Sequence, residues 1–475
     1  MDALIVGSGP NGLAAAITIA RAGRSVRVVE AKSTIGGGVR SSDSRASPFI
    51  HDHCSAIYPL GVGSPFFRSL ELERLGLEWI HPEVPLAHPF DDGSAAVLHR
   101  SIDETCRGLG EDEAAYRRLM EPLVSHWESL ADEILRPMLH LPRHPLLLAR
   151  FGLLAIQSAT RLVRHRFRGP AARALFSGLA AHSFLPLEAV ASSAVALLLA
   201  TLGHAVGWPF PRGGAQRITD ALAAHLRQLG GVIETDCPIS DLRDLGNSRA
   251  VLLDLTAWQL ARLAGSGLRD SYRRRLAAFP HGPAVFKIDY ALDAPIPWRA
   301  EACRRAGTVH LGGTHAEIAT AEGSVARGLP AARPFVLLAQ QSLFDPTRAP
   351  AGKHTAWAYC HIPRGCAIDA TEAIEAQIER FAPGFQRCIL ARQVSAPANL
   401  ESANANLVDG DISGGGADLW HLIARPTLSF VPYRTPRRGL YMCSSSTPPG
   451  AGVHGMCGFH AARAALGREL AGGGK

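Results

Sequence analysis

The feature that most constrains this chain is a glycine-rich turn near its start. Gly7, Gly9 and Gly12 form the pattern G-x-G-x-x-G between an apolar run at residues 3–6 and an alanine-rich stretch at residues 11–22. A dinucleotide-binding βαβ unit requires this order of strand, glycine turn and helix. The first glycine permits the tight turn, the second lets backbone approach a pyrophosphate, and the third lets helix and strand pack closely. This start predicts an α/β fold with a parallel sheet.

A second strand and an acidic residue complete the unit. Residues 25–29 are mostly apolar, and Glu30 follows them directly. Its carboxylate can accept hydrogen bonds from ribose hydroxyls, and its charge disfavours a 2′-phosphate. The N-terminus of the intervening helix supplies free N–H groups and a positive dipole end to a pyrophosphate. The alternative interpretation is a glycine turn in another kind of α/β protein.

A second glycine loop favours FAD over NAD. Gly37 and Gly38 come shortly after the second strand, and Arg40 and Ser41 follow them. This loop fits a cofactor longer than one βαβ unit can hold, and the Arg40 guanidinium can neutralise a pyrophosphate. No second G-x-G-x-x-G stands between a strand and a helix, which argues against a separate NAD domain. We therefore expect one tightly held FAD.

Helical and strand-rich segments alternate along the rest of the chain. Residues 110–205 are rich in Leu and Ala, and residues 211–235 repeat a helix-then-strand step. Residues 284–291 alternate as a strand does, with Phe286 pointing one way and Lys287 the other. The predicted fold class is α/β. We expect a discontinuous Rossmann-like FAD-binding domain (1–90, 206–265 and 425–475), a helical cap (91–205) and a substrate domain with a mixed β-sheet (266–424).

Cysteine spacing and charge exclude several classes of protein. The nine cysteines include no C-x-x-C pair, which argues against a dithiol redox site or zinc ribbon and for free thiols in a reducing compartment. The net charge of +7 comes from dispersed arginines, so we expect no nucleic-acid partner. His51–Cys54 has no second ligand cluster at metal spacing, so no metal is expected. We find neither a leader nor an apolar run long enough to span a membrane, and expect a cytoplasmic protein.

One helical segment has the composition of a surface-bound membrane helix. Residues 146–154 are apolar, and arginines flank them, among them Arg136, Arg143 and Arg161. A basic-flanked apolar helix can lie on a membrane surface. The alternative is a buried cap helix with arginines at its exposed ends. Peripheral association with a membrane is therefore a second expectation for the protein's location.

Motifs along nearly the whole chain resemble a known family. The glycine turn, the Pro211–Gly214 step and the tail Gly439–Gly458 together resemble the phytoene desaturase-like flavoproteins of the flavin amine oxidase superfamily. The most similar branch is phytoene dehydrogenase-related and is labelled pyridine nucleotide-disulfide oxidoreductase domain-containing protein 2. The missing cysteine pair rules out the disulfide chemistry of that label.

The resemblance extends the expected FAD site beyond the glycine turn. It implies that the strand at 236–239 lies beside the adenine and that the C-terminal loop reaches the rest of the cofactor. Gly452 and Val453, at the start of the last helix, would present N–H groups to the flavin pyrimidine. The expected FAD-binding residues are Gly7, Gly9, Pro10, Asn11, Gly12, Glu30, Ala31, Gly37, Gly38, Arg40, Ser41, Cys237, Pro238, Ile239, Ser445, Ser446, Gly452 and Val453.

Three residues are candidates for the chemistry itself. Lys287 is one of only four lysines and lies within an apolar strand. That segment is similar to the amine-oxidase strand whose lysine holds a water against flavin N5; alternatively Lys287 is exposed or pairs with Asp289. The resemblance places His53 beside the isoalloxazine, as a polar wall or proton acceptor. It places His454 at the flavin N1 edge.

These features predict an FAD-dependent oxidoreductase. The expected reaction is dehydrogenation or desaturation of a small apolar, isoprenoid- or lipid-like substrate by hydride transfer to flavin N5, because the Ala/Leu/Phe-rich cap fits an apolar ligand. A redox-neutral flavin isomerase or a saturase is the alternative among enzymes. A binding or regulatory protein that FAD stabilises, without turnover, is the alternative from another class.

Overall fold

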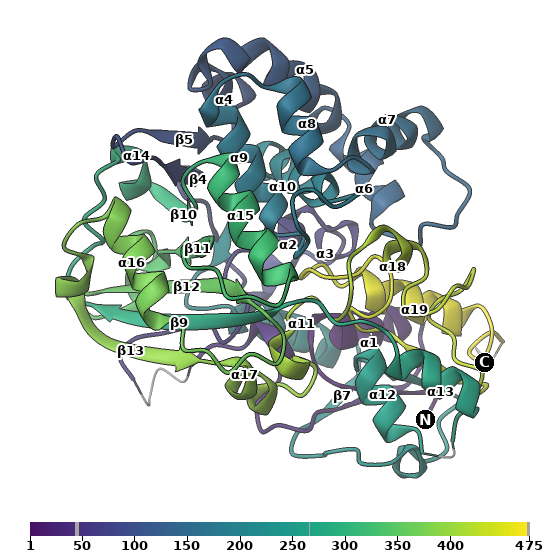
Figure 1. Ribbon diagram of the computed structural model, residues 1–475. Coiled ribbons are helices and arrows are strands. Elements are labelled where there is room, and N and C mark those ends of the chain that lie inside the picture. Colours follow the sequence, from purple (N-terminus) through teal and green to yellow (C-terminus); the bar gives the residue numbers. More distant parts are fainter. Residues whose placement is uncertain (43–46, 266, 473–475) are drawn as a thin grey trace.

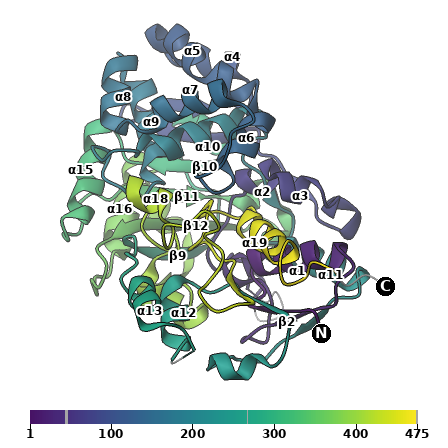
Figure 2. The same cartoon turned by 90° about the vertical axis from the view of Figure 1, so that its right-hand side faces the viewer.

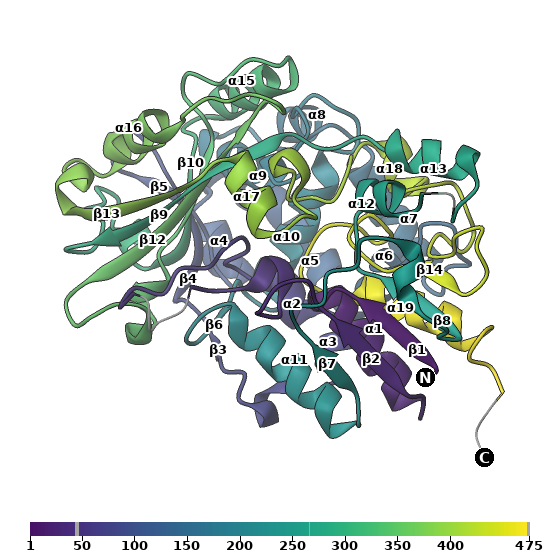
Figure 3. The same cartoon turned by 90° about the horizontal axis from the view of Figure 1, so that it is seen from below.

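Figure 1 shows the computed structural model, which describes residues 1–42, 47–265 and 267–472. Two sheets lie at the centre of the described chain, and a group of helices covers one side of the larger sheet. The purple N-terminal and yellow C-terminal segments lie together, far from the teal and green sheet strands at the opposite end of the molecule (Figure 3). The fold is α/β, as predicted.

The smaller sheet is built from apolar runs that the sequence marks clearly. Its order is β14–β8–β1–β2–β7, and each neighbouring pair is parallel. Helices cover both faces, which is why the strands are continuously apolar. The strands are β14 (Leu440–Met442), β8 (Ala250–Leu253), β1 (Ala3–Val6), β2 (Val26–Val29) and β7 (Val232–Glu234). The helices are α1 (Pro10–Arg21), α11 (Gln216–Gln228) and α19 (Met456–Leu466) on one face, and α12 (Ala257–Leu263) and α13 (Asp270–Ala277) on the other.

The larger sheet is mixed. Its order is β13–β9–β12–β11–β10–β4–β5, in which only β10 and β4 run parallel among the described pairs. The strands are β13 (Ile389–Ser395), β9 (Ala284–Leu292), β12 (His354–Ile362), β11 (Val336–Ala339), β10 (Ala306–Leu311), β4 (Val84–Pro89) and β5 (Ala95–Leu98). The alternation predicted in β9 is confirmed. Phe286 packs into the core beside α14 (Glu301–Arg304) and α16 (Thr371–Phe381), whereas Val285 packs on the opposite side.

The larger sheet begins earlier in the chain than the sequence indicates. Strands β4 and β5 lie where the expected FAD-binding domain (1–90) gives way to the expected cap (91–205). In the structure both belong to the larger sheet, because Leu86 on β4 pairs with Thr308 on β10. That pairing joins segments far apart in sequence, and no local pattern announces it.

Helices of the cap lie above the larger sheet (Figures 1 and 2). Helix α9 contacts β4, β5, α10 and α15, so it lies between the sheet and the outer helices. The cap helices are α4 (Ile102–Arg107), α5 (Glu113–Val124), α6 (Trp127–Ile134), α7 (Pro145–Ala155), α8 (Ala159–Arg166), α9 (Pro170–Ala181) and α10 (Ser193–Ala205). The remaining elements are α2 (Pro59–Gly63), α3 (Pro65–Arg68), α15 (His315–Ala326), α17 (Pro397–Ala403), α18 (Leu419–Ile423) and a small antiparallel sheet of β3 (Trp79–Ile80) and β6 (Phe210–Pro211).

Candidate active site

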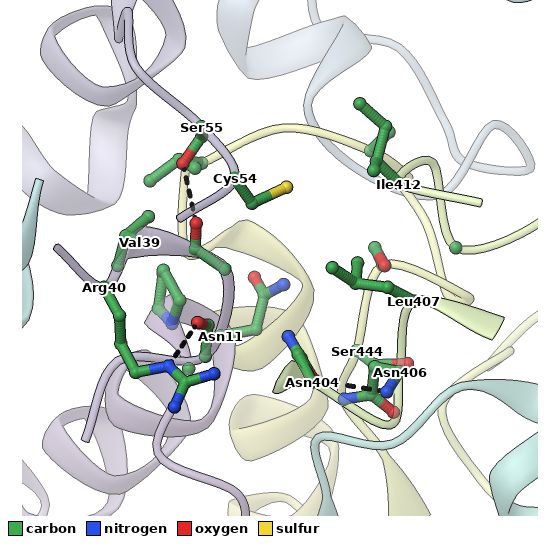
Figure 4. Close-up of a pocket in the computed structure, with 18 of the residues that line it drawn as sticks. Asn11, Val39, Arg40, Cys54, Ser55, Asn404, Asn406, Leu407, Ile412 and Ser444 are labelled. Carbon is green, nitrogen blue, oxygen red and sulfur yellow. Dashed lines mark hydrogen bonds between the residues drawn. The ribbon is translucent and has the colours of Figure 1, made fainter. Parts of the chain in front are cut away.

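A cavity of about 520 Å³ connects the glycine turn with the cap. Residues from the ends of the parallel strands line one part of it, and Figure 4 shows the side chains there. Strands β10, β11 and β12 supply another wall, and the cap supplies the far end through residues such as Leu199 and Trp208. One space is thus bounded by both sheets and by the cap.

The glycine turn brings backbone close to backbone. Gly7 has φ of +99°, a conformation that glycine adopts without strain. A methyl group on Gly12 would lie 2.1 Å from the Gly7 carbonyl oxygen, so no larger residue fits there. A methyl group on Gly9 would lie 2.7 Å from Oδ2 of Asp254. The turn therefore permits the close approach that its sequence pattern predicts.

Positive groups gather at the start of α1. The helix has no acidic residue in its first turn, and Pro10 and Asn11 of that turn line the cavity. The Gly12 N–H donates to Asp254, and the positive dipole end of the helix is available to an anion. Arg40 lines the cavity, and its Nε and Nη2 donate to the carbonyls of Gly37 (3.0 Å) and Ala403 (2.5 Å). Those bonds fix the guanidinium in place and leave other N–H groups to bind a phosphate.

Glu30 lies at the end of β2 with its carboxylate in the wall of the cavity. Its Oε2 accepts from the Ser8 amide (3.0 Å) and hydroxyl (2.6 Å), and its Oε1 accepts from the Lys32 amide (2.9 Å). A carboxylate has about four acceptor positions, so it can still accept from ribose hydroxyls. The buried Oδ1 of Asn11 has no partner among the described residues, although Asn11 lines the cavity. These residues fit a dinucleotide such as FAD.

Most of the predicted FAD-binding residues line this one cavity. They are Gly7, Gly9, Pro10, Asn11, Glu30, Ala31, Gly37, Gly38, Arg40, Cys237, Ile239, Ser445, Gly452 and Val453. The structure places Gly12, Ser41, Pro238 and Ser446 outside the lining. The Ser41 hydroxyl donates to Asp52 (2.7 Å) and the Ser446 hydroxyl to the Gly414 carbonyl (2.7 Å), so both are occupied within the protein. Gly452 and Val453 precede the last helix, which begins at Met456, instead of starting it.

Sequence reasoning missed two contributors to the cavity. Asp254 follows β8, and its Oδ2 accepts from the Gly12 amide at 2.9 Å. Burial raises the pKa of Asp254 to about 7. Asn406 donates through Nδ2 to the Asp254 carbonyl (2.8 Å) and accepts through Oδ1 from the Thr256 amide (2.9 Å). Its own amide donates to Oδ1 of Asn404 (Figure 4). An acidic residue directly after the apolar run at 250–253 could have identified Asp254 from the sequence. No local motif marks Asn406.

Lys287 lies beneath the cavity wall instead of in it. Its side chain is 3% exposed and forms an ion pair with Asp289, two residues along β9. The ammonium lies 6.0 Å from the centre of the Trp357 ring, and Trp357 and Tyr359 line the cavity above β9. The pairing with Asp289, one of the alternatives that the sequence left open, is thus the arrangement present. The role of Lys287 in the reaction stays a prediction.

The two candidate histidines also lie outside the lining. His53 is exposed, and its amide donates to the Arg40 carbonyl at 2.8 Å. His454 is buried behind Gly452, where a methyl group would lie 3.1 Å from His454 Cδ2. Its Nδ1 accepts from the Met456 amide (3.0 Å), and burial lowers its pKa to about 4, so the ring is neutral near pH 7. The structure does not bring Lys287, His53 and His454 together at one point.

Neither a metal cluster nor a disulfide is found among the described residues. No group of three His, Cys, Asp or Glu side chains there is arranged to hold a metal ion. All nine cysteines lie in the described ranges, and each is a free thiol. The cavity lining combines the backbone of the glycine turn with Arg40, the carboxylates of Glu30 and Asp254, neutral polar side chains such as Asn11 and His182, and many apolar side chains.

Comparisons with known proteins agree with this geometry. The family described as flavin containing amine oxidoreductase matches residues 11–455. Pyridine nucleotide-disulfide oxidoreductase domain-containing protein 2 of Mus musculus is 26% identical, over 97% of this chain and 92% of its own length. A limonene dehydrogenase component of Castellaniella defragrans is 27% identical over 29% of this chain and 24% of its own. The structure of an oxidoreductase from Methanosarcina mazei has a TM-score of 0.65 and 16% identity, covering 98% of this chain and 100% of its own.

Proposed function

Because this chain belongs to the family of flavin-containing amine oxidoreductases, we propose that it is a dehydrogenase or desaturase of an apolar, isoprenoid- or lipid-like substrate. Membership of the family makes the chain an FAD-dependent oxidoreductase. When bound, FAD supplies the hydride acceptor. The proposal concerns the substrate and the bond that is oxidised.

In such a reaction, one set of residues would hold the cofactor and another would enclose the substrate. Gly9 and the first turn of α1 would hold the pyrophosphate, together with Arg40, and Glu30 would bind the adenosine ribose. The cap and the larger sheet close the other part of the cavity and exclude water from the reacting C–H bond. Among the described residues, the Asp, Glu and Lys side chains that line the cavity are Glu30, Lys32 and Asp254, and all three lie beside the glycine turn. The proton that accompanies the hydride would therefore leave to a weak acceptor or to solvent.

One observation supports an apolar substrate most directly. The part of the cavity beneath the cap is lined mainly by hydrocarbon and aromatic side chains. They are Phe184, Leu199, Trp208, Leu337, Ala339 and Trp357. Such walls favour a ligand that buries apolar surface, at about 25 cal/mol per Å². The partial similarity to a protein named as part of a limonene dehydrogenase points in the same direction.

Anaerobic reduction of the bound flavin tests this proposal. The holoprotein is mixed without oxygen with isoprenoid hydrocarbons, isoprenoid alcohols and acyl lipids, and the visible absorbance of FAD is followed. A dehydrogenase bleaches its flavin with at least one of these, and its product contains a new double bond. An isomerase converts substrate with the flavin spectrum restored after each turnover, and a saturase does so only from reduced FAD. A binding protein leaves both flavin and ligand unchanged.

We further propose that the enzyme collects its substrate at a membrane surface. Apolar side chains are exposed on α7 and on the loop before it, with exposed fractions of 86% for Leu146, 71% for Leu153 and 91% for Leu141. Figures 1 and 2 place α18, which is followed by Leu428 and Phe430, on the same side of the molecule. Both of these residues are exposed as well. Transferring each leucine out of water is worth about 1.5–3 kcal/mol.

The charge around this apolar face favours anionic lipid over a second protein chain. Residues 135–187 contain eight arginines and not one aspartate or glutamate. Each arginine near an anionic bilayer contributes about 1 kcal/mol, whereas two copies of so basic a surface would repel each other. No single helix among the described residues is long and apolar enough to cross a membrane, and α7 and α8 meet at 98°. These observations favour binding at the membrane surface over a helix that crosses the membrane.

Flotation with lipid vesicles tests the membrane contact. The holoprotein should float with phosphatidylcholine vesicles that contain phosphatidylglycerol, and less with phosphatidylcholine alone or at high salt. The double variant Leu146→Gln/Leu153→Gln should stay at the bottom of the gradient. Leu329→Gln, which changes a leucine 57% exposed elsewhere on the surface, is the matched control and should float. Wild-type protein that never floats, or that self-associates through the same leucines, would rule the membrane contact out.

A further inference from the structure

The far end of the cavity holds a polar spot within the otherwise apolar walls. His182, just after α9, lines the cavity, and its Nε2 lies 3.0 Å from Nε2 of His310 on β10. Its other ring nitrogen, Nδ1, has no hydrogen-bond partner among the described residues. Trp208, packed edge-on against His182, shields the pair on one side. A polar atom of the protein is therefore presented to the ligand beneath the cap.

A third histidine, His88, lies near the pair, because it and His310 both approach Gly178 on α9. Nε2 of His88 lies 2.6 Å from the Gly313 carbonyl, so His88 must donate there and keep a lone pair on Nδ1. Burial lowers the pKa of His182 to about 3 and that of His88 to about 4, so these rings are neutral near pH 7. Each neutral ring has one donor and one acceptor nitrogen.

Gly178 on α9 lies where His310 and His88 approach each other. A methyl group there would lie 2.8 Å from Nδ1 of His310 and 3.4 Å from Nδ1 of His88. Neither of these Nδ1 atoms has a hydrogen-bond partner among the described residues, so the His182–His310 contact is compatible with either direction of donation. In both tautomers, Nδ1 of His182 keeps one hydrogen-bonding function, as an acceptor or as a donor, for a ligand.

Thr308 provides a second polar group in the lining of the same cavity. It lies on the same face of β10 as His310, two residues away. Its Oγ1 is buried and has no partner among the described residues. A buried hydroxyl without a partner costs about 1–3 kcal/mol, which a ligand that completes the bond would recover. The imidazole nitrogen and the threonine hydroxyl together suit a ligand group that both donates and accepts.

We propose that His182 and Thr308 bind a hydroxyl group of the substrate, so that the preferred ligand is an apolar alcohol and not a pure hydrocarbon. The hydroxyl would bond to Nδ1 of His182 and to Oγ1 of Thr308, donating to one and accepting from the other. This inference rests on the proposed function for the apolar body of the ligand and adds the polar contacts that orient it. His310 and Gly178 act as positioning residues, because His310 bonds to Nε2 of His182 and Gly178 leaves room for the His310 ring.

Binding to the oxidised holoprotein tests the assignment without turnover. Isoprenoid alcohols and hydrocarbons of the same skeleton, such as perillyl alcohol and limonene, are titrated while the flavin absorbance is followed. The wild-type protein should bind at least one alcohol about tenfold or more tightly than its hydrocarbon. His182→Phe should bring this ratio to about one and leave the hydrocarbon affinity within about twofold. His182→Gln, which keeps an acceptor, should retain part of the preference.

Two further variants keep the test decisive. Gly178→Ala should lower the same ratio without changing a cavity side chain, because its methyl group displaces His310. Thr308→Val should lower it while preserving side-chain shape. Flavin content of each variant reports whether it has folded. If no alcohol binds more tightly than its hydrocarbon, or if His182→Phe leaves the ratio unchanged, the inference is wrong. Flavin that never bleaches with any ligand would instead contradict the proposed function, whatever the binding ratio.

Discussion

The carboxylate of Asp254 accepts a 2.9 Å hydrogen bond from the backbone amide of Gly12. This bond joins the residue that follows β8 to the first turn of α1, and both segments contribute residues to the same cavity lining. The glycine turn is therefore held from behind by an acid as well as by its own backbone packing. Its geometry depends on a residue far away in sequence.

The raised pKa of Asp254 predicts a pH dependence of stability. Its pKa is about 7 in the folded protein and near 3.8 when unfolded, so the folded state holds more protons between these values. Stability of the flavin-free protein should therefore fall as pH rises from about 4 to about 7, and Asp254→Asn should remove this slope. Urea unfolding at about pH 5 and about pH 8 measures it. An equal slope in wild type and variant would contradict the assignment.

The buried pair of Lys287 and Asp289 predicts that a single and a double variant differ in stability. Lys287→Met alone leaves a buried carboxylate without its partner, at a cost of about 3–5 kcal/mol, whereas Lys287→Met/Asp289→Leu removes both charges and should recover most of the loss. Thermal unfolding of the holoprotein gives the comparison.

Flavin kinetics separate a structural role of Lys287 from a chemical one. If Lys287 acts on the reaction, flavin reduction or reoxidation stays slow in the double variant although stability returns. If both half-reactions and stability are unchanged in Lys287→Met, neither role holds.

Glu30 and Arg40 should contribute to FAD affinity in different ways. Glu30→Ala removes acceptors for ribose hydroxyls and should weaken FAD binding by about tenfold to a hundredfold. Arg40→Met removes the cation near the pyrophosphate, so its loss of affinity should be larger at low salt than at high salt. Titration of the flavin-free protein with FAD measures both. A salt dependence that is equal in wild type and Arg40→Met would place Arg40 outside the phosphate site.

Much of the cofactor end was predictable, because its determinants are local. The G-x-G-x-x-G turn, the strand before it and Glu30 after the second strand lie within about thirty residues, and each has its own backbone or hydrogen-bonding requirement. The substrate end of the cavity could not be predicted from the sequence. His182 follows α9 and Thr308 lies on β10, and only the tertiary fold brings both into one cavity lining. Asn406 reaches the cavity from a loop without a motif. Contacts between distant segments leave no periodic signal in either one.

Lys287 also shows that a sequence pattern leaves the contacts of a side chain undetermined. Its rarity and its apolar strand left three interpretations open: a role at the flavin, an exposed position and a pair with Asp289. The structure shows the pair, with the ammonium buried. The period of two placed Lys287 on the face of β9 opposite Phe286, but the partner on that face, Asp289, decides whether the charge points into the cavity or along the strand. The residue pattern along one strand does not determine which of these two directions the charge takes.

The central claim is that the glycine turn of this chain holds FAD, and the flavin content of one variant tests it most directly. Gly12→Ala places a methyl group 2.1 Å from the Gly7 carbonyl, whereas Gly152→Ala, in a helix with open space around it, is the matched control. After reconstitution, wild type and Gly152→Ala should each retain about one FAD per chain through gel filtration, and folded Gly12→Ala should retain almost none. Equal flavin in all three proteins, or none in wild type, would contradict the account.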